Sequence, residues 1–106
     1  MAHIIVETTY EKAPTDAELE AMRDRWTPCI AAKNGKWIRT YLSADRKRKI
    51  CEFEAPDAES VREAMHSAGV AFDTVWTASD VVKIEDYPEF LKKRDAVRAR
   101  LGGKSP

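Results

Sequence analysis

The chain has 106 residues, 43% hydrophobic and 34% charged, and its 18 basic residues balance 18 acidic ones. This length and composition predict a single globular domain with one modest core. A formal net charge of zero argues against a general nucleic-acid binder, because phosphate binding needs a positive field.

The two cysteines, Cys29 and Cys51, are too few and too far apart for a disulfide framework or a CxxC zinc site. Acidic residues appear too early for a signal peptide, and no apolar run approaches the ~20 residues that span a membrane. We therefore expect a cytoplasmic protein with reduced thiols that does not enter a membrane.

A strand and a capped helix open the chain. Residues 3–10 are rich in β-branched side chains, which predicts a strand. Residues 15–18 (TDAE) have the form of a capping box and predict a helix start. The apolar positions of this helix follow helical spacing, namely Leu19, Met22, Trp26 and Ile30. Pro28 lies inside this run and predicts a kink or a new helix start near residues 26–28.

A hairpin and a second helix follow. Residues 36–43 and 47–54 predict two strands joined by a polar turn, and Pro56 ends the second of them. Asp57 is the expected N-cap of a helix that ends at Gly69. The apolar positions of this helix are Val61, Ala64, Met65 and Ala68.

The last third of the chain predicts one more strand and one more helix. The apolar residues between positions 72 and 85 are typical of a broken strand. A final helix starts at residues 86–89 (DYPE), since proline is favoured in the first helical turn, and Gly102-Gly103 ends it.

This order of elements, strand-helix-strand-strand-helix-strand, is typical of the α+β ferredoxin-like split βαβ sandwich. We expect a ferredoxin-like domain at residues 1–86 and a C-terminal helix and tail at residues 87–106. Right-handed crossovers put both helices of the domain on one face of the sheet, so the other face stays open.

Strand alternation assigns side chains to these two faces. The helix-covered face collects Ile4, Val6, Ile38, Leu42, Cys51 and Phe53. The open face collects His3, Ile5, Glu7, Trp37, Arg39, Tyr41, Ile50, Glu52 and Glu54. This open face is too apolar for water and too charged for a core, so we expect two sheets to pair as a homodimeric α+β barrel.

Glu7 and Glu52 are expected to lie near each other because the first and third strands are neighbours in this topology. Two close carboxylates repel each other unless a cation, an arginine or a shared proton intervenes. Arg39 on the adjacent strand is one answer and a metal ion is the other. The nitrogen and oxygen donors available to a metal such as nickel are His3, Glu7, Glu52 and Glu54. In the alternative interpretation, His3 is a frayed terminal residue and the glutamates are exposed or paired with arginine.

Two other reactive residues are assigned elsewhere. Cys51 belongs to the helix-side core. His66 precedes the end of the second helix, where its neighbours Ala64 and Met65 take the core positions, so we expect its ring at the surface.

Several of these segments resemble a family of small bacterial ferredoxin-like proteins, mostly of unknown function, whose members are often described as nickel-binding. The matching pieces are residues 5–7, 37–41, 51–57, 61–63 and 68–70, with Asp73 just beyond. EAPD at residues 54–57, followed by the helix, is the most specific of them, and neither histidine lies in a matching piece. The resemblance covers about residues 3–85. It implies a ferredoxin-like protomer that dimerises through its sheet, with divalent metal binding as its activity.

Three functions are compatible with this sequence. The first is a dimer that binds nickel or another divalent transition metal. The second is a small cofactor-independent enzyme, monooxygenase- or isomerase-like, with Glu7 or Glu52 as general base. There, Trp37, Arg39 and Tyr41 would line a ligand pocket in the dimer interior. The third is a structural or regulatory dimer without a small ligand. The basic C-terminal helix suits an acidic partner or a membrane surface, but we expect it to pack across the dimer instead.

Overall fold

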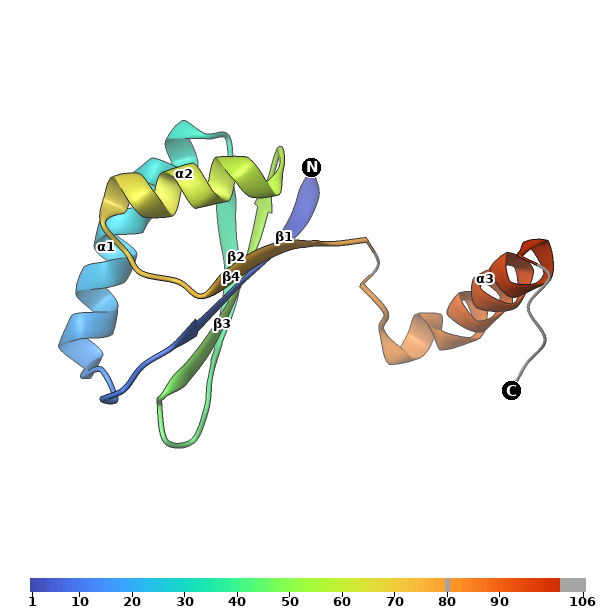
Figure 1. The fold of residues 1–106 in the computed structure, drawn as a ribbon, viewed down its shortest axis with the longest axis horizontal. Helices are drawn as coiled ribbons and strands as arrows, with labels where there is room; N and C mark the ends of the chain where they lie inside the picture. The colour runs from blue at the N-terminus through green and yellow to red at the C-terminus, as the bar shows by residue number, and fades with distance from the viewer. Residues whose placement is uncertain (80, 102–106) are drawn as a thin grey trace.

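The computed structural model describes residues 1–79 and 81–101. In chain order its elements are β1 (Ala2–Thr9), α1 (Asp16–Ala32), β2 (Lys36–Leu42), β3 (Arg48–Ala55), α2 (Ala58–Ala68), β4 (Thr74–Ala78), the 3-10 turn η1 (Ile84–Asp86) and α3 (Tyr87–Arg100). The strands form one antiparallel sheet in the order β2-β3-β1-β4 (Figure 1). This confirms the α+β class. Within the described residues, no helix combines the length and apolar character that crossing a bilayer requires.

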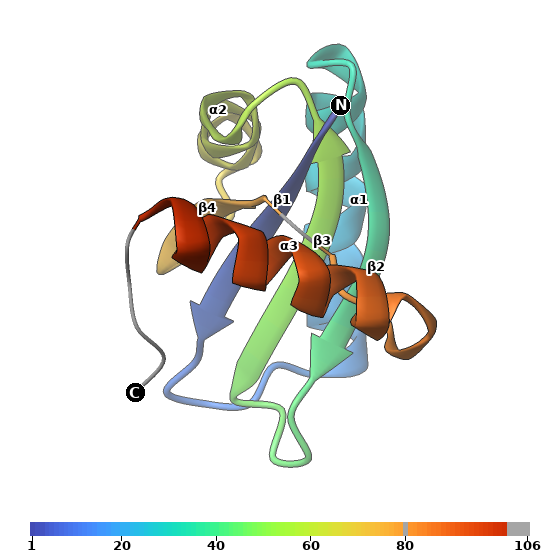
Figure 2. The same ribbon diagram turned by 90° about the vertical axis from the view of Figure 1, so that its right-hand side faces the viewer.

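One face of the sheet is covered and the other is open. Helices α1 and α2 lie side by side on the covered face, and α3 stands on the open side at a distance from the sheet (Figures 1 and 2). The core lies between the sheet and the two helices, where the Trp26 ring meets the Phe53 ring edge-on at 5.8 Å. Among the residues that the structure describes, no layer therefore packs against the open face.

The helix starts follow the capping signals in the sequence. The Glu18 amide donates to Thr15 Oγ1 and the Thr15 amide donates to Glu18 Oε1, both at 3.1 Å, which is a complete capping box. Asp57 accepts a 2.7 Å hydrogen bond from the Ser60 amide, and Gly69 ends α2 in the left-handed conformation with φ 67°. Helix α1 continues through Pro28, so no new helix starts there.

The predicted alternation of β2 is wrong in its first half. The register pairs Trp37 with Phe53 and Arg39 with Glu52, and an irregularity between the two leaves Ile38 without a partner on β3. One extra residue reverses the face of every side chain before it. Trp37 therefore lies on the helix-covered side, where its Nε1 donates to Thr40 Oγ1 at 2.9 Å.

The last strand is shorter than the sequence predicts. β4 pairs only with β1, and the pairing ends where Ala78 meets His3, near the start of β1. A longer strand would have no neighbour to bond with, so the predicted strand over residues 72–85 shrinks to Thr74–Ala78. The predicted helix end at Gly102-Gly103 falls outside the described residues.

Candidate functional site

The open face of the sheet carries rows of side chains whose order follows from the strand register. Each row crosses the sheet from β4 through β1 and β3 to β2. The rows are Ala78-His3-Glu54-Lys36, Trp76-Ile5-Glu52-Arg39 and Thr74-Glu7-Ile50-Tyr41. Apart from Trp37, this face holds the side chains that alternation predicts for it.

Glu52 contacts side chains from both neighbouring strands. Its Oε2 lies 3.2 Å from Arg39 Nε and 3.5 Å from His3 Nε2. The side chains of Glu52 and His3 are only 16% and 21% exposed, while Arg39 is mostly in solvent. A half-buried carboxylate thus has one permanent cation and one imidazole beside it. Arg39 was one of the two charge-balancing partners that the sequence left open, and it contacts Glu52 here.

Glu7 has partners of its own on the other side of β1. The Thr74 hydroxyl and the Trp76 indole N–H donate to Glu7 Oε2 at 3.0 and 3.1 Å. In the register Glu7 faces Ile50, whereas Glu52 faces Ile5, so the two carboxylates occupy diagonal positions rather than opposed ones. Each carboxylate is satisfied separately, and the structure does not bring them into one cluster.

Glu54 also stands apart, with its Oε2 3.4 Å from Lys36 Nζ at the edge of the sheet. In the parts of the chain that the structure describes, no three His, Cys, Asp or Glu side chains form a group that could hold a metal ion. Of the four predicted metal ligands, the described structure brings only His3 and Glu52 into contact. These two residues are called the His3–Glu52 pair below.

Exposed apolar side chains share the open face with the His3–Glu52 pair. Trp76 is 46% exposed and Tyr41 52% exposed on the open face, and Ile5 lies between Trp76 and Glu52 in the register. Exposed aromatic side chains that gather on one face are typical of an interface or a ligand site. The open face is therefore the candidate contact surface of the sheet.

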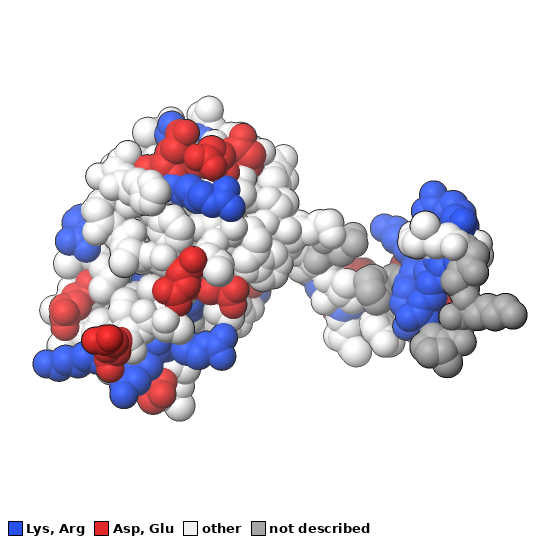
Figure 3. Space-filling view, in the orientation of Figure 1, with Lys and Arg blue, Asp and Glu red and all other residues white. Residues whose placement is uncertain are grey.

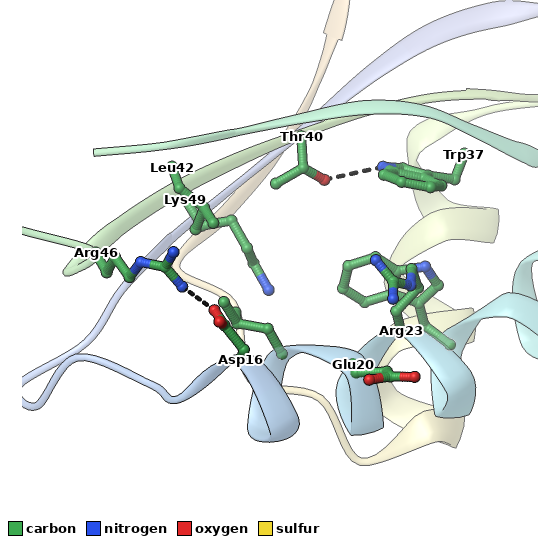
Figure 4. A pocket seen from close by; sticks show the side chains of 10 residues that line it. Asp16, Glu20, Arg23, Trp37, Thr40, Leu42, Arg46 and Lys49 are labelled. Atoms are coloured by element: carbon green, nitrogen blue, oxygen red, sulfur yellow. Dashed lines mark hydrogen bonds and ion pairs between the residues drawn. The ribbon is translucent and has the colours of Figure 1, made fainter. Parts of the chain in front are cut away.

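The predicted ligand pocket of Trp37, Arg39 and Tyr41 is not one site. Arg39 and Tyr41 lie on the open face, whereas Trp37 lies on the helix-covered face because the irregularity in β2 reverses its direction. Trp37 instead lines a cavity between α1 and the β2–β3 hairpin (Figure 4). Sequence reasoning missed this cavity, although one signal was present: Lys49 shares the core face of β3 with Cys51 and Phe53.

The two reactive residues assigned away from the open face are found away from it. Cys51 is buried in the core, and this burial raises the pKa of its thiol, while the Thr40 hydroxyl donates to its Sγ at 3.2 Å. His66 is exposed on α2, and its ring stacks on Phe72 at 5.4 Å between ring centres. Both predictions are confirmed.

Comparisons with known proteins agree with the family that the sequence resembles. The crystal structure of SCO4226 from Streptomyces coelicolor A3(2) matches with a TM-score of 0.69 at 17% identity, covering 76% of this chain and 100% of that one. No curated protein sequence shows significant similarity. The family model described as nickel responsive protein SCO4226-like matches residues 4–77. This match spans more than half of the sequence, and the chain therefore belongs to the SCO4226-like nickel responsive protein family.

Proposed function

We propose that this protein is a ferredoxin-like homodimer that binds a divalent transition metal such as nickel on its open face. The observation that carries the proposal is the contact between His3 Nε2 and Glu52 Oε2, at 3.5 Å, on a face that no described layer of the chain covers. The description of the family as nickel responsive supports the same metal.

The donors of this pair fit the metal in kind. Imidazole nitrogen and carboxylate oxygen are both ligands that nickel(II) accepts. The two side chains are mostly shielded from solvent, and they project from neighbouring strands, β1 and β3, whose register holds them in place. A site on a rigid sheet loses little conformational freedom when it binds.

The pair falls short in number, because nickel(II) usually takes four to six ligands. A second copy of the chain would supply a second His3 and Glu52 if the two open faces met. The carboxylates of Glu7 and Glu54, which belong to the same face, would then be available as further donors or as partners of the ligands.

The same pairing would also cover Trp76, Tyr41 and Ile50, which one protomer leaves partly exposed. Two sheets packed in this way form a dimeric α+β barrel with a polar interior. Helix α3 stands clear of its own sheet on this side (Figures 1 and 3). It carries the exposed Val97, with the exposed Leu101 just beyond its end, and it would be free to pack on the partner.

Two measurements on metal-stripped protein test this function. Sedimentation velocity at micromolar concentration should give a dimer. Saturating nickel should raise the melting temperature, since a ligand at about 100 times its dissociation constant stabilises a protein by about 2.7 kcal/mol. A monomer with a melting temperature that does not respond to nickel, zinc or copper would contradict the proposal.

A further inference from the structure

On the helix-covered side of the sheet, a cavity of about 500 Å³ lies between α1 and the β2–β3 hairpin. Its walls combine apolar side chains from both layers with charged groups at the rim. The apolar members are Leu19, Trp26, Trp37 and Leu42. Its size lies within the range of about 300–1,000 Å³ that is usual for small-molecule sites.

Lys49 projects from β3 into this cavity (Figure 4). The residue is only 3% exposed, yet in the described parts of the chain no carboxylate forms an ion pair with it. Its Nζ lies 4.9 Å from the Trp26 ring centre, 5.5 Å from that of Tyr10 and 3.9 Å from Met22 Sδ. Aromatic rings offset part of the cost of burying an ammonium, but they do not replace an anion.

Trp26 provides a second unsatisfied group in the same wall. It is 4% exposed, and its Nε1 is buried without a hydrogen-bond acceptor. An unpaired buried donor is unfavourable, because it has lost its hydrogen bond to water without gaining another. The ammonium without a counter-ion and the indole N–H without an acceptor thus belong to two side chains that line one cavity, and an anion in it would satisfy the ammonium directly.

The charged side chains that line the cavity sum to one positive charge. Arg46 is paired with Asp16, and the Arg23 guanidinium lies over the Trp37 ring at 5.9 Å from its centre. Three cations, Lys49, Arg23 and Arg46, face two carboxylates, Asp16 and Glu20. The local excess is one positive charge, and it resides on the most buried group.

We propose that this cavity binds a small organic monocarboxylate with a flat apolar body, with Lys49 holding the carboxylate and Trp26 and Trp37 contacting the body. This site shares no residue with the proposed metal site at His3 and Glu52 and does not depend on it. It gives the protein a small-ligand function on the covered side of the sheet.

The test compares 2-naphthoate with its neutral counterpart 2-naphthamide, titrated into the wild-type protein and followed by the indole N–H signals in NMR spectra. Naphthoate should bind at least tenfold more tightly than the amide. It should shift the signals of Trp26 and Trp37, which line the cavity, and leave Trp76 unchanged on the opposite face. This readout needs no mutant, so it stands even if a substitution prevents folding.

A matched pair of variants then isolates the charge. Lys49→Met keeps an unbranched side chain of similar length and should weaken naphthoate binding at least tenfold while leaving naphthamide binding unchanged. Lys36→Met removes a lysine from the opposite face and should leave both affinities unchanged. Equal affinity for acid and amide, naphthoate binding that survives Lys49→Met, or shifts confined to Trp76 would each overturn the assignment, as would no binding of naphthoate.

Discussion

His3 Nε2 lies 3.5 Å from Glu52 Oε2, although the strand register sets His3 opposite Glu54. The imidazole therefore reaches diagonally from β1 to a carboxylate of β3 that Arg39 also contacts. Glu54 is taken by Lys36 at the sheet edge instead. This diagonal contact selects Glu52 over Glu54 as the companion of His3, and it centres the candidate metal site on the row that also holds Ile5 and Trp76.

If the open faces pair, a charge introduced among their aromatic side chains should separate the protomers. Tyr41→Glu places a carboxylate on this face and should raise the dimer dissociation constant at least tenfold, because dimerisation would have to remove the new charge from water. Sedimentation at a series of concentrations measures the change. Ala32→Glu adds the same charge at the exposed end of α1 and should not alter assembly. Equal dissociation constants for the two variants would rule out the open face as the interface.

The two thiols should differ in reactivity. Burial raises the pKa of Cys51 and keeps it in the unreactive thiol form, whereas Cys29 is partly exposed on α1. Iodoacetamide at neutral pH should therefore modify the native protein at Cys29 alone, as mass spectrometry would reveal. In the Cys29→Ser variant, iodoacetamide should label the remaining Cys51 only after denaturant has unfolded the protein. Rapid labelling of native Cys29→Ser would mean that Cys51 is accessible and that the core near β2 opens readily.

Asp57 should stabilise α2 in a pH-dependent way. Hydrogen bonds from Ser60 hold the pKa of this carboxyl below its ordinary value of 3.8. Its ionised form therefore favours the folded state above that value, and this contribution is lost as the pH falls through the lower pKa of the folded protein. Asp57→Ala should lower the melting temperature by roughly 4–8 °C at pH 7, and the deficit should shrink below pH 3.8.

The control for this cap is Asp24→Ala, which removes an exposed carboxylate from the middle of α1. It should cause no comparable loss, since alanine is the best helix former. A deficit for Asp57→Ala that stays the same from pH 7 to pH 3 would show that the carboxylate charge does not contribute to the cap.

The close approach of α1 to β3 depends on Gly35. A methyl group there would lie 3.0 Å from both the Glu54 carbonyl oxygen and Ile30 Cγ2, closer than such contacts normally occur. Gly35→Ala should destabilise the protein by about 1–3 kcal/mol through overpacking, as urea unfolding would measure. An unchanged midpoint of urea unfolding would mean that Ile30 and the Glu54 backbone can shift to accommodate the methyl group without loss of stability.

The sequence predicts the elements well where local signals are strong. The capping box at Thr15, the N-cap Asp57 and the left-handed Gly69 each fix a helix end through contacts within a few residues. The core face of β1 and β3 also follows from alternation, because both strands are regular and each lies between two neighbours.

The faces of β2 could not be predicted in the same way. Nothing in KWIRTYL interrupts the alternation, and β2 is an edge strand, so an extra residue costs little there. The irregularity before Arg39 moves Trp37 to the helix side, where Thr40 accepts its indole hydrogen bond and Arg23 lies over its ring. Arg23 belongs to α1, and Thr40 comes within reach of Trp37 only because of the irregularity, so the alternation of β2 does not encode these contacts.

The site was predicted in part for a related reason. Alternation placed His3, Glu7 and Glu52 on one face, but it could not say which donors each carboxylate would meet. Trp76 and Thr74 satisfy Glu7 because β4 pairs with β1, and β4 was predicted only as a broken strand. The separation of Glu7 from the His3–Glu52 pair thus depends on tertiary contacts with β4, which the local sequence does not predict.

The central claim is that His3 binds a divalent metal, and a nickel titration of metal-stripped protein by calorimetry tests it most directly. His66 offers a matched control, because it is the other histidine of the sequence and lies on α2 away from the sheet. We predict that the wild type and His66→Ala bind nickel equally and that His3→Ala binds at least tenfold more weakly. Nickel binding that His3→Ala leaves unchanged, or no heat of binding from the wild type, would contradict the claim.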